Sequence, residues 1–135
     1  MKILVMGLPG SGKTYLTERL VPLLDAAWYN ADNLRKMSND WDFSYEGRIR
    51  QSKRMKAFAD FESQQGRVVI CDFVCPTVQT RKNFNADIVI WMDTIQEGRF
   101  DDTNKIFEKP LNVDFHITEW NDENHLQIFK KLKNV

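Results

Sequence analysis

The segment GLPGSGKT at positions 7–14 constrains the fold more than any other feature of the chain. It fits the phosphate-loop pattern G-x-x-x-x-G-K-[ST], and it lies between a short apolar run and a stretch with leucines at helical spacing. Glycines let backbone N–H groups converge on a phosphate, and the following helix start adds positive partial charge. The alternative, a Gly-rich turn that happens to precede a helix, is disfavoured because chance matches are rare. The nucleotide-binding residues expected are Gly7, Gly10, Ser11, Gly12, Lys13 and Thr14.

Two side chains of this loop have direct chemical roles in such sites. Lys13 is expected to reach the β- and γ-phosphate oxygens, and the Thr14 hydroxyl to ligate Mg²⁺. The sequence therefore predicts ATP and Mg²⁺ as cofactors.

The 135 residues predict a single domain over residues 1–135, with no repeat or linker that divides them. Apolar runs alternate with helical stretches, which indicates α/β architecture with a mainly parallel sheet. We expect about five parallel strands flanked by helices, as in a nucleoside-monophosphate-kinase-like P-loop NTPase domain. The strands are expected at residues 3–6, 26–29, 67–73, 87–92 and 113–117.

Helices are expected at residues 13–24, from Ser44 as N-cap to about residue 65, and from Thr77 as N-cap to about residue 84. Asn121 is expected to cap a closing helix. Residues 93–110 contain few apolar side chains and are expected to form a loop.

Charge and cysteine content narrow the class of partner. Nineteen basic and 19 acidic residues give a net charge of zero, so an overall electrostatic attraction to nucleic acid or to a membrane is not expected, although a local basic patch stays open. The two cysteines do not form a secreted disulfide framework. No apolar run is long enough to span a bilayer, and no signal-peptide cleavage site follows the first strand. We expect a cytoplasmic protein with no membrane association.

Acids for metal binding or proton transfer follow two of the strands. Asp72 comes after four apolar residues, which places it at the carboxyl end of a parallel strand, where it either assists the metal or caps the next turn. Asp32 follows the second strand and either accepts a substrate proton, with Arg35 holding an anionic group, or serves as a helix N-cap.

Further candidates for substrate binding follow the second expected strand in the sequence. Arg48, Gln51 and Met55 share one helical face, and Arg48 is near enough to the helix start to reach the site. Phe43 and Phe100 occur in polar, turn-rich surroundings, where a ring either stacks on a base or anchors a loop.

Taken together, the blocks GLPGSGKT, NADNLR, NDWDFSYEGRIRQSKRM, DFVCPTVQTR and GRFDDTNKIFEKP resemble the adenylylsulfate (APS) kinase family. The phosphate loop occurs in many kinases, whereas the other four blocks in this order are much more specific. The resemblance extends from Met1 to about Pro110. It implies phosphorylation of the 3′-hydroxyl of adenosine 5′-phosphosulfate by MgATP, within sulfate assimilation.

The resemblance also implies roles at matching positions. Asp32 corresponds to a candidate base and metal-site acid, and Arg35 and Arg48 to arginines that hold the phosphosulfate. Phe43 and Phe100 correspond to two rings that sandwich the substrate adenine. The implied substrate-binding set is Asp32, Arg35, Phe43, Arg48, Gln51, Val74, Pro76 and Phe100.

Several positions depart from the family pattern. Asn30 stands where the family has an acid, and Gln51 stands where it has an asparagine. Cys75 stands where the family has a serine that is often described as forming a phosphorylated intermediate. About twenty residues of a lid have no counterpart between Thr94 and Gly98, and such a lid excludes water and supplies cations to bound nucleotides. Asp72 is a candidate to supply metal binding that the family obtains otherwise.

These residues predict an ATP-dependent kinase whose catalytic groups are Lys13 and Asp32, whose metal groups are Thr14 and Asp72, and whose acceptor is an APS-like nucleotide. Two alternatives stay open. In one, the shortened lid admits another nucleotide or a polynucleotide hydroxyl, which the basic stretch 48–56 favours. In the other, the chain is a non-catalytic ATP-dependent binding module. A homodimer is also left open.

Overall fold

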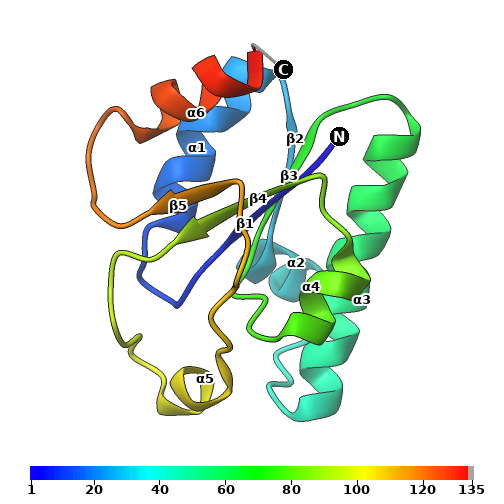
Figure 1. The fold of residues 1–135 in the computed structure, drawn as a ribbon. Coiled ribbons are helices and arrows are strands. Elements are labelled where there is room, and N and C mark those ends of the chain that lie inside the picture. Colours follow the sequence, from blue (N-terminus) through cyan, green and yellow to red (C-terminus); the bar gives the residue numbers. More distant parts are fainter. Residues whose placement is uncertain (134–135) are drawn as a thin grey trace.

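The computed structural model describes residues 1–133 and contains one parallel sheet with helices on both faces (Figure 1). The elements in chain order are β1 (Lys2–Met6), α1 (Lys13–Leu24), β2 (Ala27–Asn30), α2 (Ala31–Ser38), α3 (Tyr45–Gln64), β3 (Val69–Asp72), α4 (Val78–Phe84), β4 (Ile88–Met92), α5 (Asp101–Ile106), β5 (Phe115–Ile117) and α6 (Asn124–Lys133).

The strand order in the sheet is β2-β3-β1-β4-β5, and every neighbouring pair is parallel. The chain builds one side of β1 first, with β2 and β3, and then crosses to the other side with β4 and β5. The carboxyl ends of all five strands therefore meet at one edge, and the direction of construction reverses at β1. Ligands bind outside such a reversal point in open α/β sheets.

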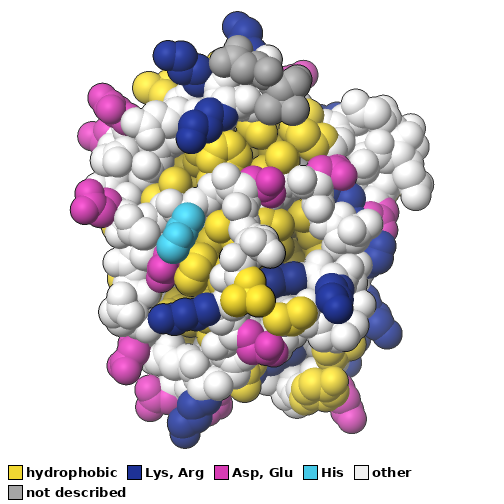
Figure 2. All heavy atoms as spheres, in the orientation of Figure 1, with side chains coloured by type: hydrophobic (Ala, Val, Ile, Leu, Met, Phe, Trp, Pro, Cys, Tyr) yellow, Lys and Arg dark blue, Asp and Glu magenta, His cyan; other side chains and the backbone are white. Residues whose placement is uncertain are grey.

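Alternate residues of β1 serve two separate cores, one on each face of the sheet. Leu4 and Met6 pack with residues of α2, α3 and α4, whereas Ile3 and Val5 pack with residues of α1 and α6. All of β1 is consequently buried, which explains its uninterrupted apolar sequence. Acidic and basic side chains are interspersed over the face drawn in Figure 2, in keeping with the net charge of zero.

The expected strands and most of the expected helices are present within one to three residues. Ser44 caps α3, because its hydroxyl accepts a hydrogen bond from the Gly47 N–H at 3.2 Å. Thr77 caps α4 in a capping box with Thr80. The α/β fold with about five parallel strands is confirmed.

Three local expectations are wrong. The alternative in which Asp32 caps a helix is wrong, because the N-cap of α2 is Asn30, whose side chain accepts a hydrogen bond from the Asn33 N–H. Asp32 lies in the first turn of this helix. Residues 93–110 are not wholly a loop, because they include α5. Asn121 accepts from the Glu123 N–H ahead of α6 and does not begin that helix.

The helices within residues 1–133 include none with the length and apolar character that crossing a membrane requires.

Candidate active site

The phosphate loop joins the central strand β1 to α1, and its backbone requires glycine at two points. At Gly7, with φ +151°, a Cβ would lie 2.5 Å from the Met92 carbonyl oxygen. Gly12, with φ +102°, precedes α1 and offers no side-chain cap to that helix. The first N–H groups of α1 therefore remain available to an anion. Thr94 fixes the loop by donating to the Ser11 carbonyl oxygen at 2.7 Å.

Lys13 bends back over this loop. Its Nζ donates to the carbonyl oxygens of Gly7 at 2.9 Å and Leu8 at 3.0 Å. Burial lowers the pKa of Lys13 to about 8, against the opposing effect of the Asp72 and Asp32 carboxylates. The Lys13 amine thus lies where the phosphate oxygens of a bound nucleotide would compete with the Gly7 and Leu8 carbonyl oxygens for its hydrogen bonds.

Asp72 ends β3 beside the loop and is 2% exposed. Its carboxylate accepts three hydrogen bonds, from Thr14 Oγ1 at 3.1 Å, Trp28 Nε1 at 2.8 Å and Asn30 Nδ2 at 3.0 Å. Burial raises the pKa of Asp72, while these donors and Lys13 partly offset the rise. Sequence reasoning placed Asp72 at the strand end but did not identify Trp28 as its partner.

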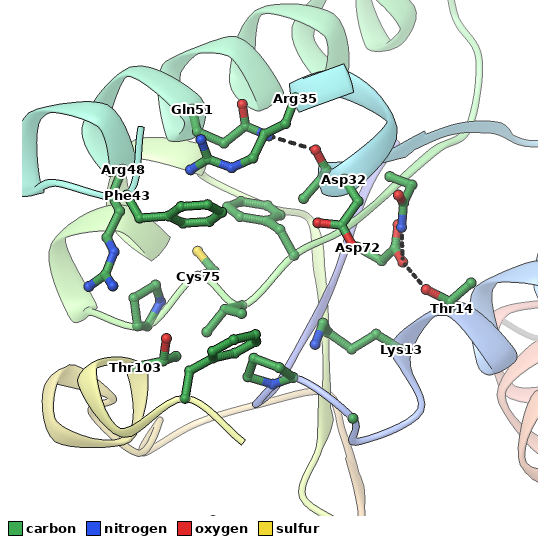
Figure 3. Close-up of a pocket in the computed structure, with 18 of the residues that line it drawn as sticks. Lys13, Thr14, Asp32, Arg35, Phe43, Arg48, Gln51, Asp72, Cys75 and Thr103 are labelled. Atoms are coloured by element: carbon green, nitrogen blue, oxygen red, sulfur yellow. Dashed lines mark hydrogen bonds between the residues drawn. The ribbon is translucent and has the colours of Figure 1, made fainter. Parts of the chain in front are cut away.

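A hydroxyl and a carboxylate are the oxygen ligands that Mg²⁺ uses when it binds through one or two side chains, phosphates and water. Thr14 and Asp72 already face each other at hydrogen-bond distance next to Lys13 (Figure 3). The donor set present at this position therefore fits a nucleotide-bound Mg²⁺.

A cavity of about 980 Å³ extends from this loop along the carboxyl edge of the sheet. Figure 3 shows Lys13, Thr14 and Asp72 at one end, Phe43 and Arg48 toward the other, and Cys75 between them. All eight residues of the expected substrate set line this cavity. So do Gly10, Gly12, Lys13, Thr14 and Asp72 of the expected nucleotide and metal sets, whereas Gly7 and Ser11 of the expected nucleotide set are not among the lining residues.

Arg35 and Gln51 are both 5% exposed, and each is partly committed to the backbone. The Arg35 guanidinium donates to the carbonyl oxygens of Asp40 at 2.9 Å and Asp42 at 3.2 Å. It also lies 4.3 Å from the centre of the Phe43 ring, and burial lowers its pKa. Gln51 Nε2 donates to the Ala31 carbonyl oxygen at 3.0 Å, which ties α3 to the start of α2.

Phe43 and Phe100 are 56% and 55% exposed, yet both line the same cavity. Phe43 precedes α3, and Phe100 is the N-cap residue of α5. These helices lie on two sides of the carboxyl edge of the sheet (Figure 1). Two rings far apart in the sequence therefore converge on one cavity.

Sequence reasoning missed an aromatic wall at the loop end of the cavity. Trp120 contacts Gly12, where an added Cβ would lie 2.8 Å from its ring, and it is 5.5 Å from the Tyr15 ring. Tyr15 donates to Asp122 at 2.7 Å and supports the Arg19 guanidinium 3.4 Å from its ring centre. Trp120 occurs in the polar stretch TEWNDEN, so the signal that identified Phe43 was present here as well.

Both cysteines are free and buried. Cys75 lines the cavity with a left-handed backbone, φ +47°, and burial raises the pKa of its thiol to about 12. Burial also raises the pKa of Cys71. Neither thiol carries a charge at neutral pH.

A central-strand phosphate loop, a facing carboxylate and a long cavity over a 2-3-1-4-5 parallel sheet define a P-loop kinase-type nucleotide-binding domain. The family model described as Adenylylsulphate kinase matches residues 1–91, and the chain belongs to this family.

Similar proteins agree with this assignment. A probable adenylyl-sulfate kinase of Aeropyrum pernix is 38% identical in an alignment of 84 residues that covers 56% of this chain and 44% of that relative, less than half its length.

Solved structures match over nearly the whole chain and show the fold. The Mycobacterium tuberculosis APS kinase in complex with AMPPNP and APS has a TM-score of 0.78 at 19% identity, covering 98% of this chain and 96% of that one. A hexameric APS kinase from Thiobacillus denitrificans has a TM-score of 0.80 at 23% identity, covering 98% of this chain and 28% of that one. Shikimate kinase from Aquifex aeolicus has a TM-score of 0.64 at 18% identity, with coverages of 99% and 97%.

Proposed function

We propose that this chain transfers the γ-phosphoryl group of MgATP to the 3′-hydroxyl of adenosine 5′-phosphosulfate. The observation that carries the proposal is the single cavity that joins a phosphate loop to two exposed phenylalanine rings and two arginines. One end suits a triphosphate, and the other suits a flat aromatic base with an anionic tail. Family membership favours this acceptor over other nucleotides, polynucleotides or a purely binding role.

The donor nucleotide occupies the loop end of the cavity in this proposal. Backbone N–H groups of the loop and of α1 bind the phosphates, and Lys13 exchanges its two carbonyl partners for phosphate oxygens. The base of ATP stacks on Trp120, whose exposed ring lies directly beside the loop.

Thr14 and Asp72 hold Mg²⁺ in this arrangement. When bound there, the ion would supply positive charge that neutralises the negative charge developing during transfer. Trp28 and Asn30 orient the Asp72 carboxylate through their hydrogen bonds to it, so the acid needs little rearrangement.

The acceptor occupies the other end. Its adenine lies between Phe43 and Phe100, with Val74 and Pro76 as apolar walls. Arg48 attracts the phosphosulfate, and Arg35 adds positive charge beneath the Phe43 ring while its backbone bonds keep it in place.

Asp32 is the proposed base. It is exposed in the first turn of α2 and lines the cavity on the same side as Asp72 and Lys13 (Figure 3). Its carboxylate accepts the proton of the acceptor hydroxyl as the oxygen attacks the γ-phosphorus in line. Most of the rate enhancement then comes from positioning and charge stabilisation.

The test is ADP release coupled to product mass, run with APS, other 3′-hydroxyl nucleotides and short DNA or RNA. We expect a product heavier than APS by one phosphoryl group. Asp32→Asn should lower kcat, and Asn33→Asp, one position along on the exposed start of α2 and outside the cavity lining, is the matched control. Turnover with an oligonucleotide but not APS, or ATP binding without any turnover, would contradict the proposal.

A homodimer and a cytoplasmic location also remain predictions. The hexameric relative from Thiobacillus denitrificans makes the solution mass of this protein a natural measurement.

A further inference from the structure

One cation of the cavity is not explained by the residues discussed so far. Arg99 lines the cavity together with Lys13, Thr14 and Asp72. Within residues 1–133 its side chain makes no hydrogen bond or ion pair, and its guanidinium lies 5.7 Å from the centre of the Phe100 ring. The Arg35 guanidinium, by contrast, is occupied by two carbonyl oxygens. Arg99 therefore brings uncommitted positive charge to the phosphate-loop end.

The backbone that carries Arg99 packs directly on the phosphate loop. At Gly98, an added Cβ would lie 3.1 Å from Pro9 Cδ and 3.2 Å from the Pro9 carbonyl oxygen. A larger residue at position 98 would require Pro9 or this segment to shift by a few tenths of an ångström. Glycine thus permits the close approach that carries the backbone next to Arg99 onto the phosphate loop.

Asn104 of α5 holds the segment from the other side. The Gly98 N–H donates to Asn104 Oδ1 at 2.8 Å, and Asn104 Nδ2 donates back to the Gly98 carbonyl oxygen at 3.0 Å. The Asn104 N–H also donates to the Phe100 carbonyl oxygen at 3.1 Å. Residues 98–104, which we call the α5 clamp, therefore form one hydrogen-bonded unit.

The electrostatics agree with this placement. Among the charges that act on the pKa of Lys13, Arg99 is the cation that lowers it, against the carboxylates of Asp72 and Asp32. Arg99 and Lys13 are both cations that line this cavity. An anion between them would bind both.

We infer that Arg99 is a catalytic residue that contacts the phosphoryl group in transfer, and that the α5 clamp couples this contact to acceptor binding. The inference rests on the proposed function. Phe100, adjacent to Arg99 in the clamp, stacks on the acceptor base, so a bound acceptor fixes the segment with Arg99 aimed at the γ-phosphate.

During transfer, the bond from the γ-phosphorus to the ADP oxygen breaks and the bond from the acceptor oxygen forms. The acceptor proton goes to Asp32, and the electron pair of the broken bond stays on ADP. Arg99 N–H groups donate to the equatorial oxygens, where negative charge is spread in the transition state.

The first experiment removes the charge. We expect Arg99→Met to lower kcat on the order of 10²- to 10³-fold, as removal of one transition-state donor does, while KM for ATP changes little. Arg99→Lys should recover part of the rate, and free guanidinium ion should rescue Arg99→Met. Lys105→Met, which removes an exposed cation of α5 outside the cavity, is the control. A kcat for Arg99→Met within twofold of the wild type would overturn the inference.

A binding readout separates this inference from the choice of acceptor. Calorimetry with MgADP alone should give equal affinity for wild type and Arg99→Met. With fluoroaluminate as a mimic of the transferring group, the variant should bind at least tenfold more weakly. If wild type and Arg99→Met bind the mimic with equal affinity, the assignment of Arg99 is wrong, even if APS proves to be the acceptor. If the variant binds the mimic more weakly but the wild type does not turn over APS, only the choice of APS as acceptor is wrong.

Asn104 acts as a positioning residue. Asn104→Ala should lower kcat by about tenfold. The double variant with Arg99→Met should be no slower than Arg99→Met alone, because both substitutions abolish the same contact, that between Arg99 and the transferring phosphoryl group. Fully additive losses would show that Asn104 supports only the local fold.

Discussion

Asn30 and Asp72 face each other in register on the neighbouring parallel strands β2 and β3, and the Asn30 amide donates to Asp72 Oδ2 at 3.0 Å. A single carboxylate therefore serves this part of the site, and the residue opposite it is neutral. Two acids at these positions would lie within hydrogen-bond distance and would share a proton, since like charges in one buried site raise a pKa.

We predict that Asp72→Asn lowers kcat by about 100-fold and raises the Mg²⁺ concentration needed for half-maximal rate, because the metal loses its carboxylate ligand. The measurement is a Mg²⁺ titration of the initial rate. The double variant Asn30→Asp with Asp72→Asn keeps one acid and one amide at these two positions. Its kcat should be higher than that of Asp72→Asn alone. If Asp72→Asn leaves the Mg²⁺ dependence unchanged, Asp72 is not a metal ligand.

We predict that ATP binding at pH 8 is accompanied by uptake of a proton at Lys13. Its pKa is about 8 in the free chain, so at pH 8 about half of the molecules hold a neutral amine. Phosphate anions favour the ammonium form, and ATP binding should therefore take up a fraction of a proton at pH 8 and very little at pH 6. Calorimetry in buffers of different ionisation enthalpy measures this uptake.

The control for that measurement is Lys13→Met, which has no titrating group at the position. Any binding that this variant retains should proceed without proton uptake at pH 8. An identical uptake in the variant would assign the proton to another group.

Trp120→Ala should raise KM for ATP by about tenfold and leave KM for the acceptor unchanged, since base–aromatic stacking contributes about 1–3 kcal/mol per base. Trp120→Phe keeps a ring and should lose less. Steady-state kinetics with each substrate varied in turn gives both constants. An increase confined to the acceptor KM would place the donor base elsewhere.

Phe43→Ala and Phe100→Ala should each raise KM for the acceptor about five- to hundredfold, by the same stacking estimate, with KM for ATP nearly constant. Tyr45→Ala is the matched control, because this neighbouring ring is 80% exposed and lies outside the cavity lining. An acceptor KM unaltered by either phenylalanine change would remove the ring sandwich from the proposal.

The sheet and its main helices were predictable because their signals are local. The apolar run of β1, the leucines of α1 and the caps Ser44 and Thr77 each act within a few residues of the element they specify. Parallel pairing then follows from the alternation of strands and helices.

Helix α5 and the residues Arg99 and Trp120 were less accessible to such reasoning. The α5 sequence contributes no buried residue, and the start of this helix is held by the pairing of Asn104 with Gly98. Trp120 reaches the loop only because β5 pairs with β4 and returns the chain to the carboxyl edge of the sheet. The polar surroundings of Trp120 could have marked it as a candidate ring, but which segments of the chain it contacts depends on tertiary structure.

The buried, protonated state of Cys71 and Cys75 also makes the native chain a convenient background for labelling. Maleimide dyes react with thiolates at exposed positions, so both native side chains should stay unmodified at neutral pH. Lys105→Cys, on the open side of α5, then accepts one fluorophore without any prior cysteine removal. Its emission would follow, in real time, how this short helix responds as each nucleotide arrives.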